Sequence, residues 1–206
     1  MYHPSIIDAA TYATLKNIFE VDTIKQHFAL AGGTSLALQL KHRHSVDLDI
    51  FSPTPIDTRT LELTLTANAN LTFELANSNK NMLFTFINSI KCDFIHEPSK
   101  LLQPFMVNDA INYFSIADIA AMKMHTICGR GKKKDFFDVY VLTENFGWQQ
   151  MLEWFVNKYD ESQLYFLHRS IHYFEDANDD PNIKGIAPYN KTWEEIKEFI
   201  RIRCTN

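Results

Sequence analysis

Residues 31–52 read AGGTSLALQLKHRHSVDLDIFS, and this stretch decides the fold. The letters HFALAGG are typical of a short strand that ends in a glycine turn. Thr34 or Ser35 is then placed to cap a helix that continues to Leu40. Residues 45–51 alternate apolar and polar side chains, which predicts a second strand. This order of elements indicates that the N-terminal half of the chain is an α/β unit.

Two aspartates, Asp47 and Asp49, interrupt the apolar residues of the second strand. Alternate side chains of a strand lie on one face, so both carboxylates are expected to point the same way while Val46, Leu48 and Ile50 face the core. Two like charges at this spacing are costly unless a cation lies between them. The alternative is an exposed edge strand whose solvent face carries two acids by chance.

Three features near the aspartates favour a site for phosphate and metal. Gly32 and Gly33 open a helix, whose free N–H groups can meet a phosphate. Arg43 and Ser45 lead into the strand and suit phosphate oxygens. Asp93, on the later strand SIKCDFI, offers a third carboxylate. Three such acids would hold two magnesium ions, which points to phosphoryl transfer.

The rest of the chain divides into a strand-rich and a helical part. Residues 71–76, 81–87 and 89–95 predict a meander of three strands, preceded by a helix over 57–69 that Asp57 can cap. Beyond about residue 105 the pattern becomes helical. The expected fold is therefore α+β: a mixed β-sheet with flanking helices over residues 1–105, and a helical region over 106–206 packed on that core.

Charged residues also fall on apolar stripes of the helical region. Lys123 shares a stripe with Ile116 and Ala120, so it must reach solvent or find anionic partners. Asp135 and Asp138 are expected to point inward from the next helix. Solvent exposure is the expectation for the charged residues of the two basic loops, which are His42, His44, Arg130, Lys132, Lys133 and Lys134.

Composition limits the class of protein. The formal net charge is −5, so a surface that coats nucleic acid is excluded as a property of the whole chain. Three scattered cysteines indicate neither a disulfide framework nor a zinc site. We find no signal peptide and no apolar run of membrane-spanning length, so we expect a cytoplasmic protein with no membrane partner.

The chain resembles the AbiEii/AbiGii toxin family of nucleotidyltransferases, a branch of the DNA polymerase β-like superfamily. The resemblance rests on GGTSLAL, RHSVDLDIF and KMHTICGRGKKKDFFDVYVL, in this order, and spans roughly residues 28 to 145. It implies a nucleotidyltransferase core with a helical C-terminal region. It also implies a toxin that has a cognate antitoxin and that transfers a nucleotide from an NTP to RNA, with tRNA ends a known target.

The resemblance also implies a role for each motif residue. Gly32, Gly33 and Thr34 or Ser35 would hold the triphosphate, and Asp47 and Asp49 would bind Mg²⁺. Lys123 would neutralise phosphate charge, and Asp135 would be the essential acid of the last motif. Asp93 matches the third metal-binding carboxylate of the wider superfamily. Two alternatives stay open: modification of a protein or a small molecule, and a non-catalytic module that binds nucleotide.

Overall fold

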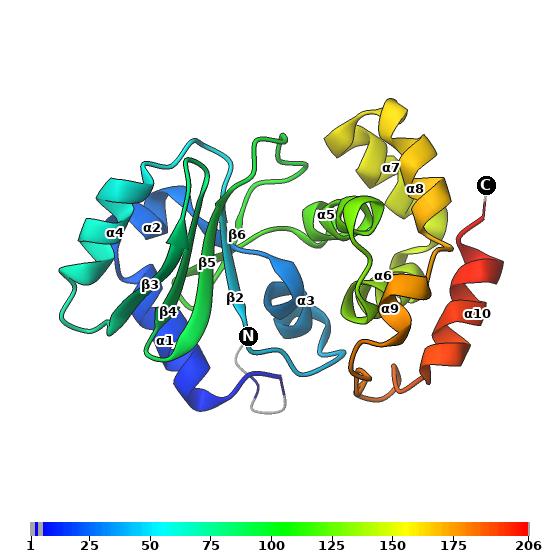
Figure 1. Ribbon diagram of the computed structural model, residues 1–206, viewed down its shortest axis with the longest axis horizontal. Helices are drawn as coiled ribbons and strands as arrows, with labels where there is room; N and C mark the ends of the chain where they lie inside the picture. The colour runs from blue at the N-terminus through cyan, green and yellow to red at the C-terminus, as the bar shows by residue number, and fades with distance from the viewer. Residues whose placement is uncertain (1–2, 4–5, 206) are drawn as a thin grey trace. The chain divides into compact units, whose positions relative to one another are not determined.

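The computed structural model of the protein describes residue 3 and residues 6–205 (Figure 1). The chain forms two compact units, of which the first holds residues 1–40 and 44–115 and the second holds residues 41–43 and 116–206. The boundary therefore falls later than the predicted residue 105, because two further strands between residues 106 and 113 belong to the sheet.

The first unit is built on one seven-stranded mixed sheet with the order β3-β4-β5-β2-β1-β7-β6. In the centre, β2 pairs in parallel with β5 and antiparallel with β1, and β1 pairs in parallel with β7. The three strands β3, β4 and β5 form the predicted antiparallel meander. The strands are β1 (Ala29–Leu30), β2 (Leu48–Ser52), β3 (Phe73–Ser78), β4 (Met82–Ile87), β5 (Ile90–His96), β6 (Met106–Asn108) and β7 (Ile111–Tyr113).

Four helices accompany this sheet: α1 (Ala9–Phe19), α2 (Asp22–His27), α3 (Gly32–Leu40) and α4 (Thr58–Thr66). Figure 1 draws α1, α2 and α4 in blue and cyan at one side of the sheet, whereas α3 contacts β2. The predicted cap of α4 is confirmed, because the Asp57 carboxylate accepts hydrogen bonds from the backbone N–H groups of Arg59 and Thr60. The expected α+β fold is thus confirmed.

Helix α3 begins at Gly32, earlier than a cap at Thr34 or Ser35 would place it. Its first residue, Gly32, has a φ of +61°, and Thr34 and Ser35 lie inside the helix, both buried. The prediction that Thr34 or Ser35 caps the helix is therefore wrong. Glycine tolerates the left-handed conformation that turns β1 directly into α3, so the helix can begin before Thr34.

The second unit consists of helices, as predicted for the C-terminal region. They are α5 (Ile116–Gly129), α6 (Lys133–Phe146), α7 (Trp148–Tyr159), a 3₁₀ turn (Glu161–Gln163), α8 (Leu164–Ser170), α9 (Glu175–Asn178) and α10 (Trp193–Arg203). Phe136, Phe137 and Phe155 are fully buried in its core. A capping box begins α10, because the Thr192 and Glu195 side chains each bond to the other's backbone N–H. No described helix is long and apolar enough to cross a membrane.

Candidate functional site

The aspartates predicted as metal ligands lie on and beside β2. Leu48 and Ile50 are fully buried, whereas Asp49 between them and Asp47 just before the strand are half-buried, so the alternation of the two faces is confirmed for Leu48, Asp49 and Ile50. Val46 is instead 49% exposed. The prediction that Val46 faces the core is wrong because β2 begins only at Leu48, so the backbone before it does not follow the pleat of the sheet.

Asp93 lies beside Asp49 in the sheet. The two residues are register partners on the parallel strands β2 and β5, so their side chains stand on the same face of neighbouring strands. Asp93 is 6% exposed, and its Oδ1 atom is buried without a hydrogen-bond partner. A buried carboxylate oxygen that no donor reaches is suited to a cation.

A lysine that we did not single out from the sequence already meets this carboxylate. Lys91 Nζ lies 2.8 Å from Asp93 Oδ2. Its hydrogen bond to Asp93 is the main cause that raises the pKa of Lys91, and the charges of Asp47 and Asp49 add to this effect against the opposing effect of burial. The period-two rule could have found Lys91, because residues two apart on a strand share a face.

The glycine turn lies against the second aspartate. A Cβ added at Gly32 would collide with the Asp49 carboxylate, so only glycine fits this approach. The N–H of Ala31 donates to the carbonyl oxygen of Asp49 at 2.8 Å, which ties the turn to β2. The glycine turn therefore lies directly against the acidic strand at Gly32.

Thr34 and Ser45, both predicted to contact nucleotide, hold the chain before β2. The Thr34 hydroxyl lies 2.8 Å from the Ser45 hydroxyl and donates to the carbonyl oxygen of Asp47. Ser35 is fully buried, and its hydroxyl accepts from the Gln39 amide at 3.1 Å. These bonds position the acidic strand, while nucleotide contact by Gly33, Thr34, Ser35 and Ser45 stays a prediction.

The residues predicted in the helical region form a buried charged cluster in the second unit. Lys123 is 7% exposed, and its Nζ atom lies 2.8 Å from Asp135 Oδ1 and 2.9 Å from Asp138 Oδ2. The inward direction of Asp135 and Asp138 is thus confirmed, and of the two outcomes expected for Lys123, the structure has the one with anionic partners. Burial alone would lower the pKa of Lys123, but the carboxylates of Asp138 and Asp135 outweigh burial and raise it. Lys123 therefore stays a cation, which suits it to neutralising phosphate charge.

Asp138 is the centre of this cluster. It is fully buried and accepts from Arg43 through Nε at 2.7 Å and Nη2 at 3.0 Å. His42 Nε2 lies 2.8 Å from Asp138 Oδ1. Burial alone would raise the pKa of Asp138, but the charges of Arg43 and Lys123 outweigh it, so the pKa lies well below its usual value. Asp138 is thus an ionised anchor for three basic side chains.

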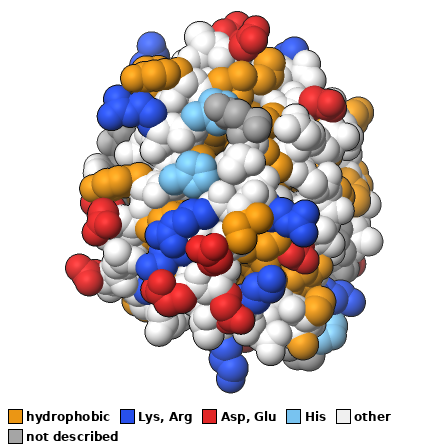
Figure 2. All heavy atoms as spheres, turned by 90° about the vertical axis from the view of Figure 1, so that its right-hand side faces the viewer, with side chains coloured by type: hydrophobic (Ala, Val, Ile, Leu, Met, Phe, Trp, Pro, Cys, Tyr) orange, Lys and Arg blue, Asp and Glu red, His pale blue; other side chains and the backbone are white. Residues whose placement is uncertain are grey.

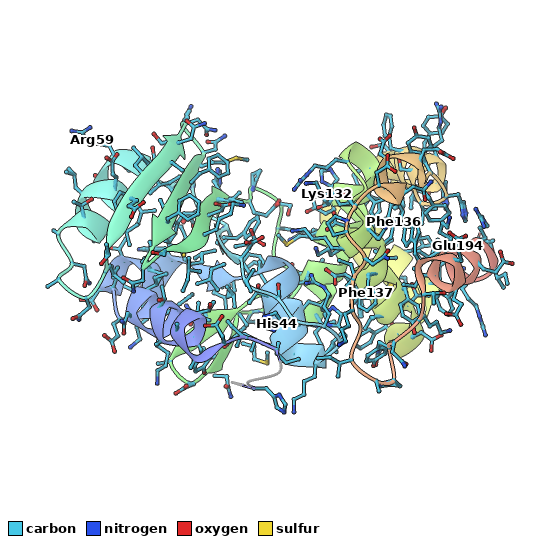
Figure 3. The ribbon with its side chains drawn as sticks, turned by 60° about the horizontal axis from the view of Figure 1, so that its bottom comes forward. His44, Arg59, Lys132, Phe136, Phe137 and Glu194 are labelled. Atoms are coloured by element: carbon cyan, nitrogen blue, oxygen red, sulfur yellow. The ribbon has the colours of Figure 1, made fainter. Side chains whose placement is uncertain are left out.

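The structure corrects two predictions about the basic loops, the solvent exposure of His42 and that of Lys133. His42 is fully buried and stacked on Phe137, which is labelled in Figure 3, and is not a solvated loop residue. Arg43 is 5% exposed and directs its guanidinium to Asp138, which makes it an anchor of the cluster, while its contact with phosphate stays a prediction. Lys133 is 5% exposed, although its neighbour Lys132 is exposed as predicted.

The described residues contain no group of three or more His, Cys, Asp or Glu side chains that could hold a metal ion. This finding is compatible with a magnesium site, because Mg²⁺ is often bound by one or two carboxylates together with substrate phosphates. The Asp47 and Asp49 pair, with the partnerless Oδ1 of Asp93, is the donor set that fits such an ion.

Comparison with known proteins gives a family and a fold. The family described as nucleotidyl transferase AbiEii toxin, type IV TA system, matches residues 14–82 and 84–199. An uncharacterized protein of Aquifex aeolicus (strain VF5) is 33% identical over 178 residues, which is 84% of each chain.

Two solved structures share the fold at low sequence identity. The nucleotidyltransferase toxin MenT4 of Mycobacterium tuberculosis matches with a TM-score of 0.63 and 12% identity, over 96% of this chain and 82% of that one. JHP933 of Helicobacter pylori matches with a TM-score of 0.52 and 16% identity, over 95% of this chain and 92% of that one. Since the family match covers nearly the whole chain, the protein belongs to the AbiEii family of nucleotidyltransferase toxins and is itself a nucleotidyltransferase.

Proposed function

We propose that the protein transfers a nucleoside monophosphate from an NTP to an RNA acceptor, with tRNA as the first candidate, and that the reaction depends on Mg²⁺. The observation that carries the proposal is the acidic face of β2 and β5, where the half-buried Asp49 and the buried Asp93 are register partners. Acids on one sheet face next to a glycine-led helix suit a metal-bound triphosphate.

Asp47 and Asp49 would hold the Mg²⁺, and the free Oδ1 of Asp93 is available to a second ion. When bound, the metal would polarise the reacting phosphate and offset its negative charge. The start of α3, with Gly32 and Gly33, would meet the phosphates through backbone N–H groups, because the first N–H groups of a helix are free to donate.

In the second unit, Lys123 would neutralise phosphate charge and Asp135 would be the essential acid. Their geometry supports different tasks for the two carboxylates beside Lys123. Asp138 is enclosed by Arg43, His42 and Lys123. Asp135 Oδ1 bonds to Lys123, and its Oδ2 accepts from the backbone N–H of Lys132 at 3.4 Å. We therefore assign Asp138 to holding Lys123 in place and keep Asp135 as the acid of the site.

Support for RNA as acceptor comes from the family, whose members are toxins. It also comes from exposed basic residues near the motif RHSVDLDIF and within the motif KMHTICGRGKKKDFFDVYVL. Lys41, Arg130 and Lys132 are exposed. Local basic residues can attract an RNA end even though the whole chain carries a net charge of −5. A cognate antitoxin is the expected protein partner of such a toxin, and the cytoplasm is the expected place of action.

An acceptor assay tests the proposal. The protein is incubated with Mg²⁺ and each NTP, labelled either at the α- or at the γ-phosphate, together with tRNA or with a protein extract. Label on RNA from α-labelled but not from γ-labelled NTP is the expected result, because the transferred group retains only the α-phosphate. α-Label on protein would reject the RNA acceptor, and γ-label on any acceptor would reject nucleotide transfer itself.

A further inference from the structure

The second unit contains a cavity that the proposed reaction does not use. Its volume is about 680 Å³, within the range of small-molecule sites. The walls come from the start of α6, from residues 182–185 and from the start of α10. Phe137 and Glu194, both labelled in Figure 3, belong to two of these walls.

Positive charge predominates in the lining of this cavity. Lys133, Lys184 and Lys191 line it, whereas the one acid among its lining residues is Glu194. The Glu194 carboxylate already lies 2.7 Å from Lys197 Nζ, so it offsets little of the charge of the lysines. A lining of this kind in a chain of net charge −5 favours an anionic ligand.

The excess of positive charge in the cavity lining differs from the mixture of positive and negative side chains on the nearby helical surface. Figure 2 shows that lysine and arginine side chains stand beside acidic ones on the face that includes α10, and the pair Arg201 and Glu198 on α10 is one case. Among the cavity lysines, Lys191 shares this pattern, because its Nζ atom lies 3.9 Å from Glu144 Oε1. Lys133 and Lys184 have no ion pair with any described residue, so the unbalanced positive charge of the cavity comes from these two.

The most buried of these lysines has only uncharged acceptors. Lys133 is 5% exposed, and its Nζ atom donates to Asn178 O at 3.1 Å, Asp180 O at 2.6 Å and Asn182 Oδ1 at 3.2 Å. In the described part of the chain, no carboxylate lies within ion-pair distance of this ammonium group. A buried charge without a counter-ion is costly, so an anion in the cavity would lower the free energy of this arrangement.

The polar lining offers mainly hydrogen-bond donors. Asn178 Oδ1 accepts from the Trp193 indole at 2.9 Å, and Asn182 Oδ1 accepts from Lys133. The amide oxygens are thus engaged, which leaves the two NH₂ groups to donate. Phe137, Ile183 and Ile196 add an apolar wall. The fitting ligand combines negative charge, several acceptors and an apolar surface.

We propose that this cavity binds a nucleoside phosphate, either as a free nucleotide or as one nucleotide unit of an RNA chain. The phosphate would accept hydrogen bonds from Lys184 and Lys191, while Lys133, whose three donors are already used, would add only its charge. The base would offer acceptors to the Asn178 and Asn182 amides, and its flat face would lie on the apolar wall. This site uses none of the acids assigned to the transfer reaction, so its existence does not depend on the proposed function.

The test is titration calorimetry in EDTA, so that binding through a metal at Asp47 and Asp49 does not contribute. The probes are the four nucleoside monophosphates, a short single-stranded RNA and inorganic phosphate. The variants are Lys184→Ala/Lys191→Ala and a matched control, Lys25→Ala/Lys80→Ala, which removes the same charge from exposed positions of the first unit. Thermal melts establish that each variant is folded.

We expect nucleotides or RNA to bind the wild type and the control alike. The cavity variant should bind about tenfold more weakly or worse, because it loses two charged donors. Binding of mononucleotides would identify a free nucleotide as the ligand, and binding of RNA alone would identify an RNA unit. The proposal is overturned if no probe binds, if phosphate binds as tightly as the nucleotides, or if both double variants lose equal affinity.

Discussion

Gly32 has two properties that a side chain would destroy. Its φ is +61°, and a Cβ at this position would collide with the Asp49 carboxylate. Gly147 is a natural reference, because it also has a positive φ, of +78°, but has open space where a Cβ would lie. A substitution at Gly147 would therefore cause backbone strain alone, whereas one at Gly32 would cause backbone strain and also displace the Asp49 carboxylate.

We expect Gly32→Ala to lower transfer activity by about 10²-fold or more, because a displaced Asp49 would no longer present its carboxylate correctly. Gly147→Ala should cost about 1 kcal/mol in stability and leave activity unchanged. Steady-state transfer rates and urea unfolding of both variants check this. Equal losses of activity in the two variants would show that the close contact between Gly32 and the Asp49 carboxylate is not needed for transfer.

Lys91 gives a prediction about the same acids. Its ammonium group, 2.8 Å from Asp93, repels a divalent cation bound nearby. Lys91→Met should therefore raise the affinity of the nucleotide-free protein for Mn²⁺ several-fold, consistent with about 1 kcal/mol for charges a few ångströms apart that water screens. Electron paramagnetic resonance of bound Mn²⁺ measures this, with Lys80→Met as the control. An unchanged Mn²⁺ affinity would mean that no cation site lies beside Asp93.

The sequence patterns identified the acidic residues and Lys123, but they could not show which basic side chains contact Asp138. Asp47, Asp49 and Asp93 follow from strand periodicity, and the inward Lys123 follows from helical spacing. Arg43 and His42 looked like loop residues because Asp138, which holds them, lies 95 and 96 positions further along the chain. Contacts at such separations leave no local pattern, so only the folded chain reveals them.

Among the helices, α5 is tied to its neighbour α7 by a buried ion pair. Lys158 Nζ lies 2.9 Å from Asp118 Oδ1, and both side chains are fully buried. The same helix α5 carries Lys123, so this pair also fixes an element of the charged cluster. The sequence could not reveal the pair, because the two residues are 40 positions apart.

Lys158→Met should lower the free energy of unfolding by about 3–5 kcal/mol, because it leaves the Asp118 carboxylate buried without its counter-ion. The double variant Asp118→Leu/Lys158→Met should recover most of that loss, since both charges are then absent. Urea denaturation of the three proteins gives the comparison. A single variant as stable as the wild type would contradict the ion pair as the support between α5 and α7.

At the scale of the molecule, the two units can be followed separately in solution. All three tryptophans, at positions 148, 154 and 193, belong to the second unit, so their fluorescence reports its unfolding alone. Residues 41–43 join this unit although they follow α3 in the chain, and His42 carries a pKa that burial lowers against the opposing bond to Asp138.

The pKa shift of His42 predicts how stability depends on pH. Below the unfolded pKa of about 6.5, the unfolded chain binds a proton that the folded unit excludes, so stability is lost as pH falls from that value toward the lower folded pKa. Asp138 adds a second loss below about pH 4, since its folded pKa is also lowered. His42→Gln should flatten the first loss, and the exposed His44→Gln should not. Tryptophan-monitored urea unfolding at pH 7.5 and 5.5 would contradict this if both variants kept the wild-type slope.

The central claim is that Asp47 and Asp49 carry out nucleotide transfer. The most direct test measures transfer of α-labelled NTP to tRNA by wild type, Asp47→Asn and Asp49→Asn, each shown to be folded by its thermal melt. Both variants should lose about 10²–10³-fold or more of the rate, because each lacks a metal-binding charge while keeping the shape of the side chain. Transfer at the wild-type rate by either folded variant would contradict the account.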